Sequence, residues 1–242
     1  GGGRGEDVDI DELDLADNGY KQLIVWDPAG KEIIGGYRYI VSRAENTPNL
    51  STEHYFRFSD RFRKEILPYT IELGRSFVQP KYQGSRDNQK GIYALDNLWD
   101  GLGALMVHNP DMKYFFGKVT MYGKYNREAR DIMIYFLTKY FPDTEDLVEP
   151  REPVTLDMDY EKLGELFNGG SYQEDYKILS RELRALRANV PPIINSYMHL
   201  SPTIRVFGTA LNPDFVHVEE TGLLITLADI FPIQSESHTN NI

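Results

Sequence analysis

The chain of 242 residues contains no cysteine, which excludes a disulfide framework, a thiolate nucleophile and a cysteine-ligated zinc site. No apolar run approaches the roughly 20 residues that a membrane-spanning helix needs, and no signal peptide is visible. The formal charge of −11 argues against broad nucleic-acid binding, which requires a cationic surface. We therefore expect a cytoplasmic protein that binds no nucleic acid.

Several catalytic signatures are also missing. The five histidines show no ligand-like spacing and no His-Glu-x-x-His occurs, so no metal site is expected. A Gly-x-Ser-x-Gly elbow is absent, which disfavours a serine hydrolase. No P-loop and no Gly-x-Gly-x-x-Gly fingerprint for nucleotides is present.

The residues that are present favour a packed α/β protein, since 41% are hydrophobic and 12% aromatic. β-Branched and aromatic content, helical periodicity and capping residues predict a mixed, mostly antiparallel sheet with flanking helices. Two helices have clear starts, at the caps Asn126 and Ser171. The predicted strands cover residues 21–26, 32–41, 71–79, 114–122, 205–211 and 222–230, and the predicted helices 92–107, 126–140 and 171–190.

The expected organisation is a flexible acidic lead over residues 1–17, followed by one domain over residues 18–242. An insertion at about residues 142–190 begins with an acidic stretch, 142–170, that we expect to be irregular. The turn Asp27-Pro28-Ala29-Gly30 joins the first two strands, and Gly30 is expected to supply a positive φ.

The most informative segment is the strand 71–79, which fixes Glu72 and Arg75 three residues apart. Strand alternation places these two side chains on opposite faces of the sheet. A functional interpretation makes Glu72 a base or ammonium anchor and Arg75 an orienting donor. The alternative is that each forms a structural ion pair at the margin of the sheet.

Two further features admit both functional and structural interpretations. The polar loop 83–91 precedes a predicted helix, the geometry in which backbone N–H groups bind phosphate, and it contains Gly84, Arg86, Lys90 and Gly91. A cationic row on the helix 171–190 either docks an acidic partner or anionic membrane, or is a solvated face balanced by nearby acids. Its members are Lys177, Arg181, Arg184 and Arg187.

The string Glu72-Leu73-Gly74-Arg75-Ser76 resembles the Glu-Leu-Gly-Arg-Ser signature of bacterial lipid-forming N-acyltransferases, within the GCN5-related N-acetyltransferase (GNAT) superfamily. These ornithine- and glycine-lipid synthases are often labelled hemolysins. The resemblance continues through Leu98-Trp99-Asp100-Gly101-Leu102, Tyr114-Phe115-Phe116-Gly117 and Leu211-Asn212-Pro213-Asp214-Phe215, and covers about residues 10–230. It implies a GNAT-like fold.

The resemblance also implies roles for individual residues. The family is similar to acyl-homoserine-lactone synthases, whose Asp-x-x-Asp, strand Arg and Glu-x-x-Arg pattern aligns with Asp11 and Asp14, Arg38, and Glu72 and Arg75. Glu72 and Arg75 are then catalytic, whereas Arg38, Asp11 and Asp14 bind substrate. The N–H of Val78 would hold the oxyanion, and Gly84, Arg86, Lys90 and Gly91 would hold the donor's phosphate.

The implied activity is transfer of a long fatty acyl group to the α-amine of an amino acid such as ornithine or glycine. The chain lacks the superfamily's pyrophosphate loop, which favours an acyl-phosphopantetheine thioester on acyl-carrier protein over acyl-coenzyme A; no permanently bound cofactor is expected. A peripheral contact with the inner face of the membrane is a further expectation. The alternative is a non-catalytic lipid-binding protein of the same fold. Membrane lysis, which the hemolysin label suggests, has no physical support, because the sequence shows no membrane span, no strongly amphipathic free helix and no secretion signal.

Overall fold

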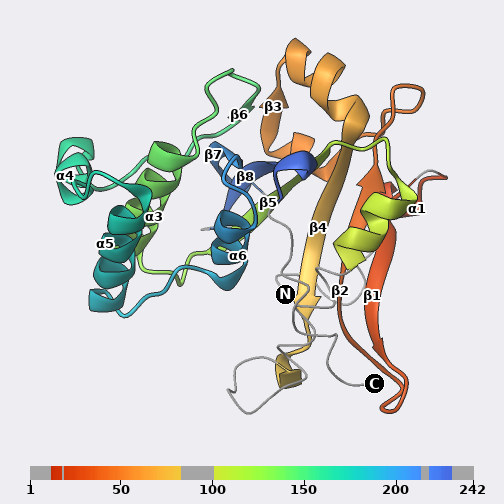
Figure 1. Cartoon of the computed structure of the whole chain (residues 1–242), viewed down its shortest axis with the longest axis horizontal. Helices are drawn as coiled ribbons and strands as arrows, with labels where there is room; N and C mark the ends of the chain where they lie inside the picture. Colours follow the sequence, from red (N-terminus) through yellow and green to blue (C-terminus); the bar gives the residue numbers. More distant parts are fainter. Residues whose placement is uncertain (1–11, 18, 83–100, 214–217, 231–242) are drawn as a thin grey trace. The chain divides into compact units, whose positions relative to one another are not determined.

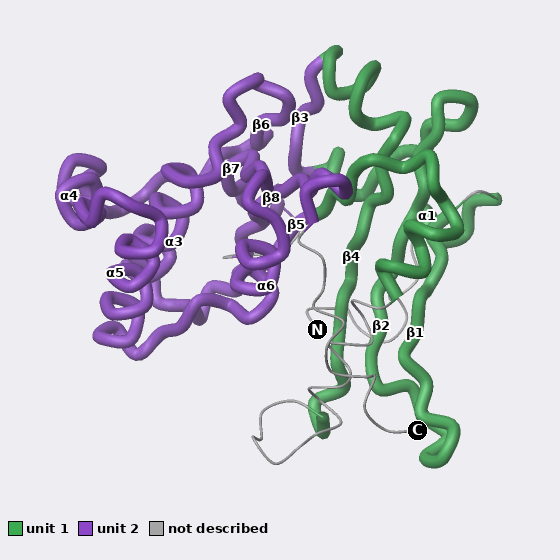
Figure 2. The backbone as a smooth tube through the Cα atoms, in the orientation of Figure 1, with its two compact units in different colours: residues 1–54, 60–117 green, residues 55–59, 118–242 purple. Residues whose placement is uncertain are grey.

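The computed structural model describes residues 12–17, 19–82, 101–213 and 218–230 (Figure 1). Its contacts divide the chain into two compact units (Figure 2). Unit 1 takes the described parts of residues 1–54 and 60–117, and unit 2 takes those of 55–59 and 118–242. Strand β5 (Tyr114–Tyr122) begins in unit 1 and ends in unit 2.

Unit 1 begins with the short helix α1 (Glu12–Leu15) and a hairpin of β1 (Lys21–Asp27) and β2 (Glu32–Val41). The turn between the strands is confirmed, with the Ala29 N–H donating to the Asp27 carboxylate at 3.0 Å. The expectation for Gly30 is wrong, because the positive φ of 53° belongs to Lys31. Trp26 on β1 is 51% exposed.

The sheet of unit 1 has the order β1-β2-β4-β5. Strand β4 (Thr70–Val78) pairs antiparallel with β2, and its residues 70–73 pair parallel with residues 114–117 of β5. The register between β2 and β4 shifts between Gly36 and Arg38, which indicates a bulge at Tyr37. The described part of unit 1 also contains the 3₁₀ turns η2 (Ser51–His54), η4 (Leu67–Tyr69) and η5 (Pro80–Tyr82), and the π-helical turn η3 (Phe62–Ile66).

A helix over residues 101–108 packs on the β1–β2 hairpin (Figure 1). A Cβ at Gly101 would lie 2.6 Å from Leu23 Cδ2 and 3.3 Å from the Tyr37 hydroxyl, so glycine permits this close approach. The remainder of the predicted helix 92–107, from residue 92 to 100, lies outside the described residues.

In unit 2, the rest of β5 lies beside β8 (Val218–Thr226), and β8 pairs antiparallel with β7 (Arg205–Leu211). The 3₁₀ turn η6 (Leu227–Asp229) follows β8, where the sequence predicted that the strand continues to residue 230. A second small sheet pairs β3 (Phe56–Phe58) with β6 (Val148–Pro150).

Helices α3 and α5 lie side by side in unit 2 (Figure 2). Aromatic side chains pack between them. Phe136 of α3 is fully buried and its ring centroid lies 5.5 Å from that of Phe167 and 5.7 Å from that of Tyr172. The helices of this unit are α3 (Arg127–Tyr140), α4 (Tyr160–Leu166), α5 (Tyr172–Ala185) and α6 (Pro192–Leu200).

Both predicted helix caps are confirmed. The Asn126 side chain accepts the Ala129 N–H at 3.0 Å, and the Ser171 hydroxyl accepts the Glu174 N–H at 3.2 Å. The expectation of an irregular stretch over 142–170 is wrong in part, since it contains β6 and α4. The mixed, mostly antiparallel sheet with flanking helices agrees with the predicted fold class.

The predicted extent of the helix 171–190 is wrong, because α5 ends at Ala185 and a separate helix α6 starts at Pro192. The stop is a Schellman motif: the Arg187 N–H donates to the Arg184 carbonyl at 3.0 Å and the Ala188 N–H to the Leu183 carbonyl at 2.8 Å. Arg187 holds the left-handed position, with φ of 55°, where glycine is usual. Because the usual glycine is missing, the sequence around Arg187 does not indicate that the helix ends at Ala185.

We expect Arg187→Gly to stabilise the protein by about 0.5–1 kcal/mol. The substitution removes the ~1–2 kcal/mol cost of holding an L-residue in the left-handed conformation. Glycine also gives the unfolded chain more conformational freedom, which offsets roughly 0.4–1 kcal/mol of that gain. Urea unfolding followed by circular dichroism measures the change. The matched control Arg181→Gly, in the interior of α5, should cost about 1 kcal/mol, and a lower urea midpoint for Arg187→Gly would contradict the prediction.

Candidate active site

Glu72 lies in the interior of the sheet of unit 1. Its backbone pairs with Ile40 of β2 on one side and with Phe116 of β5 on the other. The residue is 1% exposed. A carboxylate this deeply buried requires hydrogen-bond donors, because an isolated buried charge is strongly disfavoured.

Three residues supply those donors. The Tyr20 hydroxyl donates a hydrogen bond to Glu72 Oε2. The Thr52 N–H donates to Oε1 at 2.9 Å, while the Ser51 N–H reaches Oε2 and the Ser51 hydroxyl reaches Oε1, both at 3.3 Å. The carboxylate is thereby tied to the start of η2 and to the residue that precedes β1.

Burial raises the pKa of Glu72 above its ordinary value. Hydrogen bonds from Tyr20 and Thr52 and the positive charge of Arg38 lower the pKa, but burial has the larger effect. The pKa of Tyr20 is also raised, first by burial and then by the adjacent Glu72 carboxylate. A carboxylate with a raised pKa is a stronger proton acceptor than an ordinary glutamate.

A second group of charges is linked to the first through Arg38, which is buried on β2. The Arg38 guanidinium lies 4.2 Å from the centroid of the Tyr20 ring, a cation–π contact. Arg38 Nη1 also pairs with Asp14 Oδ1 at 2.9 Å, and Arg75 Nη1 pairs with the other oxygen of Asp14 at 3.2 Å. Asp14, carried by α1, therefore bridges two guanidinium groups.

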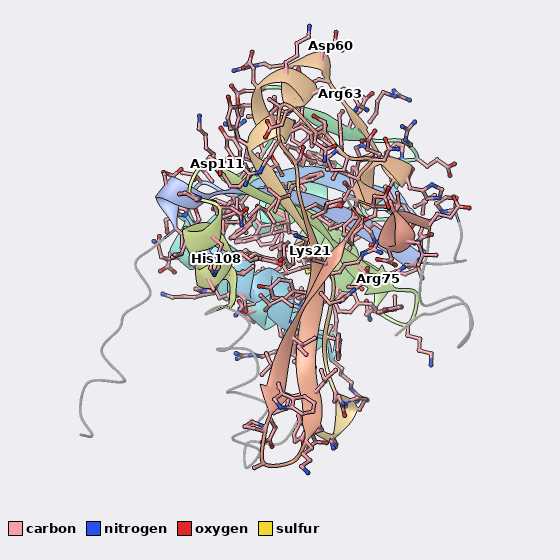
Figure 3. The ribbon with its side chains drawn as sticks, turned by 90° about the vertical axis from the view of Figure 1, so that its right-hand side faces the viewer. Lys21, Asp60, Arg63, Arg75, His108 and Asp111 are labelled. Carbon is pink, nitrogen blue, oxygen red and sulfur yellow. The ribbon has the colours of Figure 1, made fainter. Side chains whose placement is uncertain are left out.

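The expectation that Glu72 and Arg75 point to opposite faces does not describe the structure. Arg75 has φ of 48°, a left-handed conformation that interrupts the strand alternation. Its side chain reaches the same aspartate as Arg38, and it is 42% exposed. In Figure 3, Arg75 lies beside the β1–β2 hairpin, well separated from Asp60 and Arg63.

The structure thus brings together four predicted site residues, Glu72, Arg38, Asp14 and Arg75. Asp11 and the loop residues Gly84, Arg86, Lys90 and Gly91 lie outside the described residues. The Gln79 N–H donates to the Ile34 carbonyl of β2 at 2.8 Å, so strand alternation directs the N–H of Val78 away from β2.

Sequence reasoning missed Tyr20, Ser51 and Thr52. Tyr20 precedes a strand with no motif around it, and Ser51 and Thr52 follow a polar loop. Their donors reach Glu72 from 52, 21 and 20 residues away in the chain. A single sequence contains no signal for contacts at that separation.

The cationic row of α5 lies in unit 2. Lys177 pairs with Glu174 at 2.7 Å and Arg181 with Glu182 at 2.7 Å, as the interpretation of a face balanced by its own acids expects. A hollow of about 370 Å³ lies beside the row, lined by Tyr176, Lys177, Ser180, Arg181 and Arg184.

In the described ranges, no helix is long and apolar enough to cross a membrane. Among those same residues, no group of three or more His, Cys, Asp or Glu side chains is placed to hold a metal ion.

Comparisons with known proteins identify relatives over nearly the whole chain. A glycine N(alpha)-acyltransferase of Bacteroides thetaiotaomicron is 55% identical over 235 residues, which cover 95% of this chain and 70% of the relative. A protein of the same name from Phocaeicola vulgatus is 52% identical over 243 residues, which cover 98% of this chain and 74% of the relative. Residues 1–90 match the acetyltransferase (GNAT) domain family.

The chain belongs to the GNAT family of N-acyltransferases. The family confirms the predicted enzyme class and GNAT-like fold. A solved aminoglycoside 6'-N-acetyltransferase in complex with coenzyme A covers 90% of this chain and 76% of its own, with 9% identity and a TM-score of 0.35.

The raised pKa of Glu72 in this acyltransferase makes its stability depend on pH in a defined direction. Between pH 4.5, the ordinary value, and the raised pKa, the unfolded chain loses the Glu72 proton while the folded chain retains it. The free energy of unfolding should therefore fall as pH rises through this window. Urea unfolding of wild type and Glu72→Gln at a series of pH values isolates the effect, and equal pH slopes for the two proteins would contradict it.

Proposed function

We propose that this N-acyltransferase transfers a long-chain fatty acyl group from the thioester of acyl-carrier protein to the α-amine of glycine, as a step in aminolipid synthesis. The choice of glycine as acceptor rests on the name of the two relatives, each of which is more than 50% identical to this chain over almost its whole length. Their name favours glycine over ornithine. We place the reaction in the cytoplasm, with a peripheral contact at the membrane that would receive the product.

The chemistry begins with loss of a proton from the glycine ammonium group. The neutral amine attacks the thioester carbonyl carbon, the C–N bond forms, and the C–S bond breaks with departure of the thiol. Glu72 accepts the first proton, a role that its burial and raised pKa support. The second proton leaves the attacking nitrogen and protonates the departing thiolate.

Two other groups have proposed roles. Arg75 is the more exposed of the two guanidinium groups on Asp14, so we assign it to the glycine carboxylate, with Asp14 and Arg38 holding it in place. Val78 would present its N–H to the oxyanion, consistent with its direction away from β2. The donor's phosphate is assigned to the loop of Gly84, Arg86, Lys90 and Gly91 on the sequence evidence alone.

The first test is a thioester assay in which acyl-carrier protein and acyl-coenzyme A donors are each combined with glycine, ornithine and other amino acids. Glu72→Gln should lower kcat by about 10²–10⁴-fold with the preferred pair, because a positioned base contributes on that order. The matched control Glu65→Gln alters an exposed glutamate of the same unit, paired with Arg61 at 3.1 Å, and should keep full activity. A fully active Glu72→Gln would remove Glu72 as the base.

Arg75→Met should raise KM for glycine by about 10–100-fold, because it removes a charge-assisted hydrogen bond of about 1.5–3 kcal/mol. Glycinamide, which lacks the carboxylate, should react equally poorly with wild type and variant. Arg63→Met is the matched control, since Arg63 is 43% exposed and pairs with Glu53 at 2.8 Å. If the ratio of KM values for glycine and glycinamide is the same in Arg75→Met as in wild type, Arg75 does not bind the glycine carboxylate.

A further inference from the structure

The burial of Glu72 creates a problem for its proposed role. At 1% exposure, the carboxylate offers almost no surface to an amine that arrives from solvent. A general base must lie within hydrogen-bond reach of the proton that it removes, either directly or through one intervening group. An intervening group is therefore required if Glu72 is the base.

The structure offers a specific candidate among the donors to Glu72. Tyr20 is 8% exposed and Thr52 is 1% exposed, whereas Ser51 is only partly buried. The Ser51 hydroxyl donates to Glu72 Oε1 at 3.3 Å. It is thus the donor that combines a contact with the buried carboxylate and access from outside.

The backbone of Ser51 is fixed independently of its hydroxyl. Ser51 is the first residue of η2, and its N–H donates to the Tyr20 hydroxyl at 2.8 Å. The neighbouring Thr52 N–H holds Oε1 at 2.9 Å. These backbone contacts fix the position of the side chain, as a proton relay needs, and they remain when the hydroxyl is removed.

We propose that the Ser51 hydroxyl is a catalytic residue that relays the first proton from the glycine ammonium group to Glu72. Ser51 Oγ accepts the proton from nitrogen and releases its own proton to Glu72 Oε1, so the hydroxyl is restored and the carboxylate becomes neutral. Glu72 later returns this proton to solvent along the same path. The relay rests on the proposed role of Glu72 as base.

Tyr20 has a different part in this arrangement. It holds Oε2, the oxygen that the Ser51 hydroxyl does not contact, and its ring lies under the Arg38 guanidinium. It is therefore a positioning residue, which keeps Oε1 directed at Ser51. Tyr20 thus fixes Oε2, whereas Oε1 is held by the Thr52 N–H and receives the proton from Ser51.

The test compares Ser51→Ala, Ser51→Thr and the control Ser196→Ala, which removes an exposed hydroxyl bonded to the Pro192 carbonyl at 2.9 Å. Ser51→Ala should lower kcat by about 10–100-fold with little change in KM for glycine, since it removes one proton-transfer group. Ser51→Thr keeps a hydroxyl and should restore most of the rate. Ser196→Ala should match wild type.

Solvent isotope effects separate a relay from a structural role. A plot of kcat against the fraction of D₂O should curve for wild type, where two protons move together, and become linear for Ser51→Ala. Thermal unfolding of each variant shows whether the fold is intact. A folded Ser51→Ala with wild-type kcat, or an unchanged curve, overturns the relay.

The two proposals fail in distinguishable ways. If Glu72→Gln is inactive while Ser51→Ala is fully active, the relay is wrong and Glu72 remains the base. If Glu72→Gln is itself fully active, the proposed role of Glu72 is wrong and the relay falls with it.

Discussion

The buried carboxylate of Glu72 is the constraint around which unit 1 is organised. Tyr20, Ser51 and Thr52 offset the cost of burying this carboxylate by donating hydrogen bonds to it, because a buried polar group without partners is strongly disfavoured. The same hydrogen bonds join β4, the start of η2 and the residue before β1. One ionisable group therefore couples the local stability of three chain segments to the chemistry that we assign to it.

From this carboxylate a series of charges and rings extends toward solvent. The Tyr20 ring contacts the buried Arg38, which pairs with Asp14, and Asp14 pairs with the more exposed Arg75. Arg75 is the most exposed member of this series, with 42% of its side chain accessible, and so it has a surface that a carboxylate can approach. The left-handed backbone of Arg75 makes this convergence possible, since regular alternation would direct the side chain away from it.

Local signals predicted the parts of the fold that local forces determine. The helix starts at Asn126 and Ser171 were predictable because each capping side chain accepts a hydrogen bond from the backbone N–H three residues later. The end of α5 was not, because an arginine occupies the position that glycine usually marks. In the candidate site, Glu72, Arg38, Asp14 and Arg75 followed from a resemblance, whereas Tyr20, Ser51 and Thr52 meet Glu72 only through tertiary folding.

The half-exposed Trp26 of the hairpin has a spectroscopic consequence. The sequence contains two tryptophans; Trp26 lies in unit 1, Trp99 falls outside the described residues, and tyrosines occur in both units. In a Trp99→Phe variant, indole emission excited at the red edge of absorption therefore originates from unit 1 alone. Comparison of this signal with far-ultraviolet ellipticity, to which the helices of unit 2 contribute, resolves whether the two units lose structure together, without any added label.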